Sequence, residues 1–182
     1  MSVLQLTKRL TTRPQVVACS GLAVRHYQGE ADIEPWLALR RAAFARQRLG
    51  IRDWSRSDFE AEFLTRWWWR PERMWLAEPA PQSRLGLNSR DDVPPAPLIT
   101  GSVTLGCRGE AANHVPVVHW LAVHPSWRRR GVASSLVARL EAAVWEMGQR
   151  QVWLETHDAW IGAAGLYRKL GYQPASASAS QE

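Results

Sequence analysis

The sequence has few cysteines and no long apolar run. Its two cysteines, Cys19 and Cys107, lie far apart and match no metal-ligand spacing, so we expect no metal site and two free thiols in a reducing compartment. No apolar segment approaches the roughly 18 residues that a membrane-spanning helix requires. The first 29 residues contain no Asp or Glu, but no apolar core follows them, which excludes a secretory signal. These absences predict a cytoplasmic protein with no membrane partner.

Lysine is also scarce, although the chain is basic. Only Lys8 and Lys169 are lysines among 23 basic residues, and the formal net charge is +6. Such a charge fits either a solvated basic surface or an affinity for nucleic acid, a membrane or a phosphate-bearing cofactor. The arginines are scattered, and no helix pattern carries basic residues along one face, so we expect no nucleic-acid partner.

The length of 182 residues predicts one domain with a real core. We expect a flexible basic leader over residues 1–14, a single domain over residues 15–174, and a disordered Ala/Ser tail over residues 175–182. Residues 79–97 are rich in proline and polar residues, which predicts a mobile hairpin loop inside the domain.

Short β patterns alternate with helical ones along the domain. Strands are predicted over Gln15–Tyr27, Arg73–Glu78, Leu98–Gly109, Val115–Val123 and Gln151–Thr156, and helices over Ala31–Gln47, residues 55–69, Val132–Met147 and Ala159–Leu170. The order predicts an α/β fold, with a mixed, mostly antiparallel sheet flanked by helices and a βαβ crossover near the C-terminus. A short further strand can follow Gly171.

Two capping signals accompany the first two helices. Asp32 is placed to cap the first of them, and Ser57 with Glu60 fits a capping box at the start of the second. In the third helix, Val132, Leu136, Leu140, Val144 and Met147 form an apolar stripe.

The stretch "VHPSWRRRGVASSL" joins the most strongly β segment to this third helix. The first amides of a helix lack internal partners and lie at the positive end of its dipole, so they favour an anion. Gly131 allows a ligand close to the backbone, and Ala133 and Ser134 keep the first turn slim. The alternative is a solvated basic loop, but the position between a buried strand and a helix favours a phosphate site. The stretch matches neither GxxxxGK[ST] nor GxGxxG.

The spacing from Arg128 to Ala133 fits the pattern R/Q-x-x-G-x-G/A, and here the sequence resembles the GNAT superfamily of N-acetyltransferases. That family's motif cradles the pyrophosphate of coenzyme A. The later segment "LYRKLGY", Leu166–Tyr172, resembles the family's L/F-Y-x-x-x-G-F/Y motif, and the element order over residues 16–172 agrees. The resemblance implies the GNAT-like (acyl-CoA N-acyltransferase) fold and acetyl-CoA as the acyl-donor cosubstrate.

The resemblance also implies how the cosubstrate is held. Its pantetheine arm would pair with the backbone of a splayed strand, and its phosphates would sit on the turn that opens the third helix, with one or two of the arginines near them. A tryptophan stands where the family often has asparagine and could cover the cosubstrate. The implied binding residues are Leu121, Ala122, Val123, Arg128, Arg129, Arg130, Gly131, Val132, Ala133, Ser134 and Trp160.

Tyr167 lies in the second motif and corresponds to the family's usual general acid, which protonates the departing thiolate. A phenol with a pKa of about 10 is a reasonable donor to that group. A packed helix residue is the alternative.

The base is less well defined. His119 should share a strand face with Val117, Leu121 and Val123, and it resembles one of the paired histidines of the serotonin N-acetyltransferase type, although Val117 occupies the other position. A hydrogen-bonded core histidine is an equal alternative. Glu155 is the second choice for the base, or else a solvated strand residue.

These features predict direct transfer of an acetyl group from acetyl-CoA to a primary amine in a ternary complex, because no cysteine is expected where an acyl-enzyme would form. The acceptor can be a small molecule or a protein amino group. The alternative function is a non-catalytic acyl-CoA-binding or regulatory module. The chain ends soon after Tyr172, so the family's final strand is short or missing. One wall of the acceptor site would then be open, or completed by another subunit as in a homodimer.

Tryptophan is abundant, with 11 residues. Trp67, Trp68 and Trp69 cannot all face the core, since consecutive helical residues point about 100° apart. They predict either an aromatic pocket for an amine or, as the favoured alternative, core packing with an oligomer surface.

Overall fold

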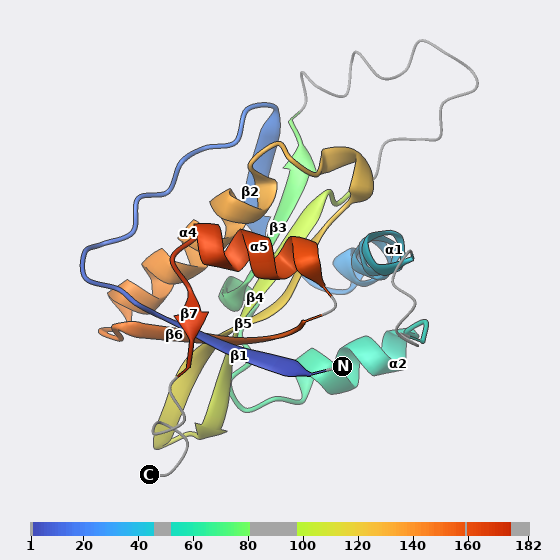
Figure 1. Ribbon diagram of the computed structural model, residues 1–182. Coiled ribbons are helices and arrows are strands. Elements are labelled where there is room, and N and C mark those ends of the chain that lie inside the picture. The colour runs from blue at the N-terminus through green and yellow to red at the C-terminus, as the bar shows by residue number, and fades with distance from the viewer. Residues whose placement is uncertain (1, 46–51, 81–97, 159, 176–182) are drawn as a thin grey trace, which may run out of the picture.

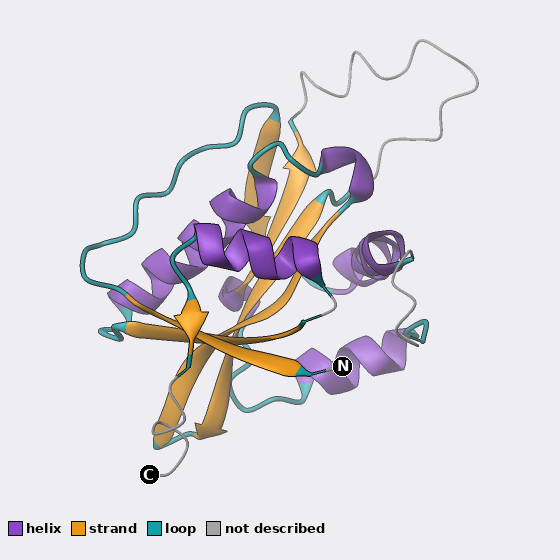
Figure 2. Ribbon diagram, in the orientation of Figure 1, coloured by secondary structure: helices purple, strands orange, loops and turns teal. Residues whose placement is uncertain are grey.

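The computed structural model describes residues 2–45, 52–80, 98–158 and 160–175. In this part of the chain, seven strands form one mixed sheet with helices on both faces (Figures 1 and 2). The sheet order is β2–β3–β4–β5–β6–β1–β7. The strands are β1 (Val3–Arg9), β2 (Leu22–His26), β3 (Met74–Pro79), β4 (Gly101–Glu110), β5 (Asn113–Val123), β6 (Gln151–His157) and β7 (Gln173–Pro174).

The helices form two layers. They are α1 (Ile33–Phe44), α2 (Arg56–Phe59), α4 (Val132–Glu146) and α5 (Ile161–Lys169), and a π-helical turn, η2 (Glu60–Leu64), continues α2. Short 3-10 turns precede α1, β3 and α4 as η1 (Glu30–Asp32), η3 (Pro71–Arg73) and η4 (Pro125–Trp127). The predicted α/β class with a mixed, mostly antiparallel sheet is confirmed.

One face of the sheet packs against α4 and α5. The predicted stripe on α4 is confirmed for Val132, Leu136, Leu140 and Val144, which are at most 2% exposed. The stripe ends at Val144, because Met147 lies past the end of the helix and is 40% exposed. The opposite face packs against α1, α2 and η2, through a second cluster of buried aromatic and aliphatic residues.

The expectation of a flexible leader over residues 1–14 is wrong for Val3–Arg9, which form β1 between β6 and β7. Leu6 and Leu10 enter the core. The positive charge of Lys8, one of those that suggested a basic leader, is neutralised because Lys8 Nζ lies 2.7 Å from Oε2 of the buried Glu141. The sheet edge beside β6 is therefore covered by the chain's own N-terminal strand.

The start of the domain also differs from the prediction. The strand expected from Gln15 begins only at Leu22. Asp32 makes no side-chain cap on α1. Its carboxylate instead accepts hydrogen bonds from Arg25 at 2.6 and 2.8 Å and from the Gln28 backbone N–H at 2.7 Å, so a buried ion pair takes the oxygens that a cap would need.

The capping box of α2 lies two residues earlier than predicted. Ser55 has the extended conformation of a capping residue and pairs with Asp58 in both directions. Glu60 instead accepts a hydrogen bond from Arg56 at 2.8 Å. Pro79, the first residue of the predicted hairpin loop over residues 79–97, instead ends β3. Residues 81–97 lie outside the described part of the chain, as does most of the predicted tail.

Candidate functional site

A groove opens where β5 and β6 diverge. These two strands run parallel, and within the described residues their only register pair joins Val117 to Trp153. Figure 1 shows them running apart behind α5. The groove has a volume of about 1550 Å³. It is lined by every predicted site residue except Arg130, namely Tyr167, His119, Glu155, Leu121, Ala122, Val123, Arg128, Arg129, Gly131, Val132, Ala133, Ser134 and Trp160.

At one end of the groove lies the turn that opens α4. Gly131 precedes the helix in the left-handed region, with φ 82°, and Arg129 is left-handed as well, with φ 62°. The Ser135 N–H donates to Gly131 O at 2.9 Å. The preceding N–H groups of Val132, Ala133 and Ser134 have no partner among the described residues. Free amides at a helix start form an anion cradle.

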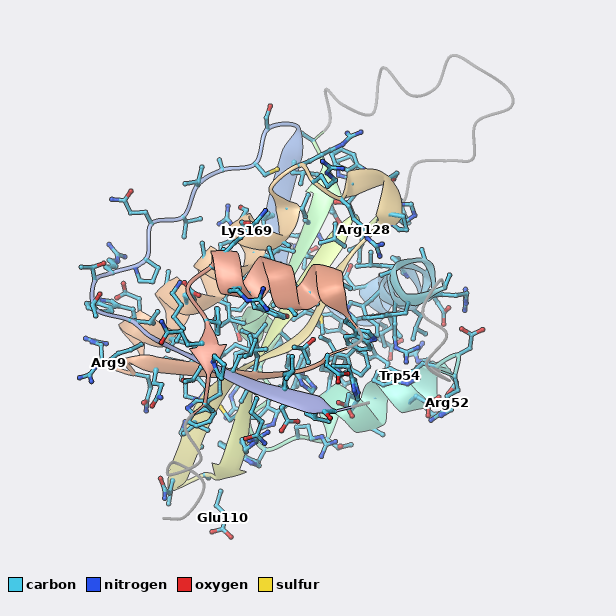
Figure 3. All side chains as sticks on the ribbon, in the orientation of Figure 1. Arg9, Arg52, Trp54, Glu110, Arg128 and Lys169 are labelled. Carbon is cyan, nitrogen blue, oxygen red and sulfur yellow. The ribbon has the colours of Figure 1, made fainter. Side chains whose placement is uncertain are left out.

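The three arginines of this turn have different surroundings. Arg128 donates to Ala43 O at 2.7 Å and to Val123 O at 3.3 Å, and Figure 3 shows it on the side of the turn that faces α1. The Arg130 guanidinium lies 5.0 Å from the centre of the Trp127 ring. Arg129 lines the groove, and no ion pair or hydrogen bond of its side chain is found in the described chain. Of these three arginines, Arg129 therefore is the one that lines the groove and whose side chain has no partner among the described residues.

The edge of β5 carries a bulge at Trp120, whose φ is 48°. Two residues of β5 face one residue of β4 there, so the alternation of side chains changes. His119 and Trp120 both lie on the α1–α2 face, where each contacts Glu62. Leu121 and Val123 pack on the α4 face instead. The prediction that His119 shares a face with Leu121 and Val123 is therefore wrong, because a strand pattern of period two does not reveal a bulge.

Glu62, in the π-helical turn η2, is a groove residue that the sequence prediction missed. Its Oε1 accepts from His119 Nε2 at 2.9 Å and from Trp120 Nε1 at 3.0 Å, and its Oε2 accepts from Arg66 at 3.2 Å. The bond to His119 lowers the pKa of Glu62 to about 2 against the opposing effect of burial, and the bonds from Trp120 and Arg66 add to the lowering. Glu62 directly precedes Phe63 on a helix that borders the groove, and this position was a signal that it could lie near the site. The π turn that carries it could not be predicted from the sequence.

Tyr167 lies on α5 and is 7% exposed. Its ring packs against Tyr172, with 5.6 Å between ring centres. Burial raises the pKa of Tyr167 above the ordinary value, so the phenol keeps its proton throughout the neutral range. A buried, protonated phenol at the groove can act as a proton donor.

Glu155, the second candidate for the base, lies at the rim and is about half exposed. Its carboxylate accepts hydrogen bonds from Arg108 and from Gln5 Nε2, the latter at 3.1 Å. Glu155 and Arg108 therefore form an ion pair at the rim.

Trp160 stands at the start of α5. Its ring centre lies 5.8 Å from that of Phe44 and 5.2 Å from that of His157. Its buried Nε1 has no partner among the described residues, and the same holds for Thr156 Oγ1 and His157 Nδ1. All three residues line the groove. Unpaired buried polar atoms are costly, so this wall suits a ligand that offers hydrogen-bonding groups.

Cys107 also lines the groove, so the expectation that no cysteine lies where an acyl-enzyme would form depends on the state of this thiol. Burial raises the pKa of its thiol, despite the nearby Arg73. The nucleophilic form of cysteine is the thiolate, so this environment disfavours a covalent route. Among the described residues, no three His, Cys, Asp or Glu side chains gather as a metal site.

The three consecutive tryptophans take different positions. Trp67 is 44% exposed and Trp68 is 7% exposed, which confirms that at least one lies at the surface. None of Trp67, Trp68 and Trp69 is among the residues that line the groove. Its aromatic lining comes instead from Phe44, Trp120, Trp127, Trp160 and Tyr167.

Comparison with known proteins gives consistent matches. The profile of the acetyltransferase (GNAT) family matches residues 48–172, more than half of the chain. A curated relative, acetyltransferase ECA0875 of Pectobacterium atrosepticum, is 29% identical over 127 residues, which make up 68% of this chain and 86% of that protein.

Solved structures share the fold. A GCN5-related N-acetyltransferase from Sphaerobacter thermophilus superposes with a TM-score of 0.70 at 18% identity over 95% of this chain. The match spans 48% of that protein, so this chain corresponds to about half of it. The aminoglycoside N-acetyltransferase AAC(6')-Iy, solved in complex with CoA, superposes with a TM-score of 0.58 at 18% identity, over 85% of this chain and 90% of that one. None of the helices in the described part of this chain has the length and apolar character needed to cross a membrane.

Proposed function

This chain belongs to the acetyltransferase (GNAT) family, and from that premise we propose that it transfers the acetyl group of acetyl-CoA directly to a primary amine in a ternary complex. One observation carries the proposal: a single groove joins the free amides at the start of α4 to the side chains of His119 and Tyr167. An anion cradle at one end and proton-transfer groups further along suit a phosphate-bearing acyl donor and an amine.

Acetyl-CoA fits the groups that lie along the groove. The N–H groups of residues 132–134 and the Arg129 guanidinium suit phosphate oxygens. The β5 edge over Leu121–Val123, beyond the last register pair with β6, offers backbone N–H and C=O groups to the amides of pantetheine. Trp160 Nε1, buried without a partner among the described residues, is a further donor. Arg128 and Arg130 contribute mainly by holding the turn in place.

His119 is the favoured base. Glu155 is the alternative, but its carboxylate lies at the rim and is already paired with Arg108. His119 takes one proton from the acceptor ammonium and passes it to solvent. The amine nitrogen then forms the new C–N bond as the C–S bond breaks. Tyr167 protonates the departing thiolate, and the second proton of the nitrogen restores the phenol. One proton is released in each turnover.

Direct transfer is favoured over an acyl-enzyme because the Cys107 thiol is kept protonated by its burial. Cys107→Ser should therefore retain acetylation within a few-fold, and loss of all turnover with acetyl-CoA still bound would support the covalent route.

Thermal unfolding with and without acetyl-CoA is the first test. A ligand at 100 times its dissociation constant adds about 2.7 kcal/mol to the free energy of unfolding. Coenzyme A, adenosine diphosphate and plain buffer complete the series, and no shift at millimolar acetyl-CoA contradicts the proposal. A panel of a small amine, an amino acid, an antibiotic and a peptide N-terminus then identifies the acceptor class.

The alternative function, a non-catalytic acyl-CoA-binding or regulatory module, predicts the same thermal shift without turnover. For an enzyme, His119→Ala and Tyr167→Phe should each lower kcat by about 100-fold, while acetyl-CoA binding survives. The two free cysteines and the use of acetyl-CoA as the acyl donor also support the cytoplasm as the site of action. Fractionation of cells that express a tagged chain tests this.

A further inference from the structure

Two backbone irregularities meet beside the groove. The bulge of β5 turns His119 and Trp120 toward the same face, and the π-helical turn η2 carries Glu62 opposite them. An uninterrupted strand would place these two neighbouring side chains on opposite faces. A π turn within a helix is rare and is often found at functional sites. Together the two irregularities allow one carboxylate oxygen of Glu62 to accept hydrogen bonds from two consecutive residues of β5.

The imidazole of His119 is held on several sides. Glu62 Oε1 lies 2.9 Å from His119 Nε2. The ring of Phe63 packs edge-on against it at 5.8 Å between centres, and the ring of Trp68 does so at 5.6 Å. Glu62 is itself fixed by the Trp120 indole on Oε1 and by Arg66 on Oε2. This arrangement leaves the carboxylate little freedom to move away from the imidazole.

The contact determines which nitrogen of the neutral imidazole carries the hydrogen. The bonds that Glu62 receives lower its pKa to about 2, so near neutral pH it is a carboxylate, which only accepts hydrogen bonds. His119 must therefore donate from Nε2. Its Nδ1 then holds the free lone pair, which is the form that a base requires.

We propose that Glu62 is a positioning residue, which holds His119 in the Nε2–H form with Nδ1 free to take the proton of the acceptor amine. The inference rests on the proposed function, because it assigns how the base of that reaction is prepared. It also gives the imidazolium that forms during turnover a negative partner already in place, so charge develops on His119 without reorganisation of the site.

Other charged and titratable groups also surround His119. Cys107 and Arg108 reach the same groove from β4, Glu155 reaches it from β6, and Arg66 pairs with Glu62 from the helix side. Of these charged and titratable groups in the described chain, Glu62 alone forms a hydrogen bond with the imidazole. A change at Glu62 is therefore the one that should alter how the imidazole is held.

The test compares Glu62→Gln with the matched control Glu60→Gln. Glu60 lies in the same turn and pairs with Arg56 at the surface. Both variants keep the shape of the side chain and remove one charge. We expect Glu62→Gln to lower kcat by about 30-fold, because the amide can also donate to Nε2 and so favour the wrong tautomer. The affinity for acetyl-CoA should stay within two-fold, and Glu60→Gln should match the parent.

Rescue by the shorter carboxylate separates positioning from a merely structural role. Glu62→Asp should restore part of kcat. An unchanged kcat in Glu62→Gln would overturn the proposal, as would a rise in the amine KM alone, which would mean that Glu62 binds the acceptor ammonium itself.

A measurement independent of turnover is the tautomer of His119, read by 15N NMR of the histidine-labelled full chain at a pH where the ring is neutral. The Nε2–H form should dominate in the parent and become mixed in Glu62→Gln. If the parent acetylates no amine, the proposed function fails, and the tautomer still decides this inference: a dominant Nδ1–H form overturns it.

Discussion

The two ends of the groove are built from different kinds of chemical group. At the start of α4, the groups that line the groove are backbone amides placed by the left-handed turn at Gly131. At the other end, they are side chains such as His119 and Glu62, which lie 57 residues apart in the chain. Backbone amides are available whatever the side chains, provided that the turn keeps its conformation. Side-chain contacts between distant segments depend on the packing of every element that carries them.

This difference predicts different responses to substitution. The α4 end should depend mainly on the backbone angles of its turn, with a smaller dependence on the Arg129 side chain. The His119 end should fail when a contact between elements is removed. The two ends should also respond separately, because they draw on different helices, α4 on one face and η2 on the other.

The largest effect is expected from Lys8→Met, which removes the ion pair between β1 and α4. The Glu141 carboxylate would remain about 95% buried without its cation, at a cost of about 3 kcal/mol in the free energy of unfolding. Arg13→Met is the matched control, since Arg13 links the same N-terminal segment to Glu146 on α4 through a largely exposed pair. We expect it to cost less than about 0.5 kcal/mol.

Urea unfolding measures both variants, and the affinity for acetyl-CoA of the folded protein tests whether the two ends are separate. β1 contributes Val3 to the groove and pairs with β6, away from the amides at the start of α4. Acetyl-CoA affinity should therefore remain within two-fold. A parallel loss of stability and affinity would mean that the sheet edge also supports the cradle.

The second effect concerns the backbone of the α4 turn. Gly131→Val places a β-branched residue at φ 82°, where such residues are strained. The chain would relieve the strain by moving the amides that follow. Loss of one charge-assisted hydrogen bond is worth about 2 kcal/mol, or about 30-fold in the dissociation constant of acetyl-CoA.

Gly148→Val controls for the strain itself. Gly148 has nearly the same φ, 78°, directly after α4, and a Cβ there would have no atom within 4 Å. Both variants should lose similar stability in thermal unfolding, and calorimetry should find weaker acetyl-CoA binding only for Gly131→Val. Equal affinities in the two variants would contradict the cradle.

What the sequence could predict follows the same division. The strand, turn and helix around Gly131 are contiguous in the chain. Their pattern therefore predicted both the order of these elements and the residues that line the α4 end of the groove. β1 was missed because its pairing with β6 spans about 150 residues, and its lysine is neutralised only in the folded protein. Glu62 was missed because a π turn and a strand bulge follow from tertiary packing, which no periodicity records.

The arginines provide a third comparison, within one turn. Arg129 is the one with an uncommitted guanidinium at the groove, so Arg129→Ala should raise the acetyl-CoA KM by about ten-fold, with a smaller dependence on salt than in the parent. Arg128→Ala should mainly lower the melting temperature, because its bonds to Ala43 O and Val123 O join α1 to β5. Melting curves and steady-state kinetics measure both variants. A raised KM in Arg128→Ala together with a lowered melting temperature in Arg129→Ala would exchange these two roles.

The smallest effect is expected at Trp160, where one hydrogen atom is in question. Trp160→Phe keeps an aromatic ring against Phe44 and His157 and removes the buried Nε1–H. If acetyl-CoA accepts that hydrogen bond, its KM should rise by about five-fold, equivalent to about 1 kcal/mol.

Trp153→Phe is the control, because its Nε1 is also buried without a partner in the described chain, but the residue does not line the groove. It should leave the KM unchanged and slightly raise thermal stability, since an unsatisfied donor is removed. Equal behaviour of the two variants would mean that the unpaired indole of Trp160 does not serve the ligand.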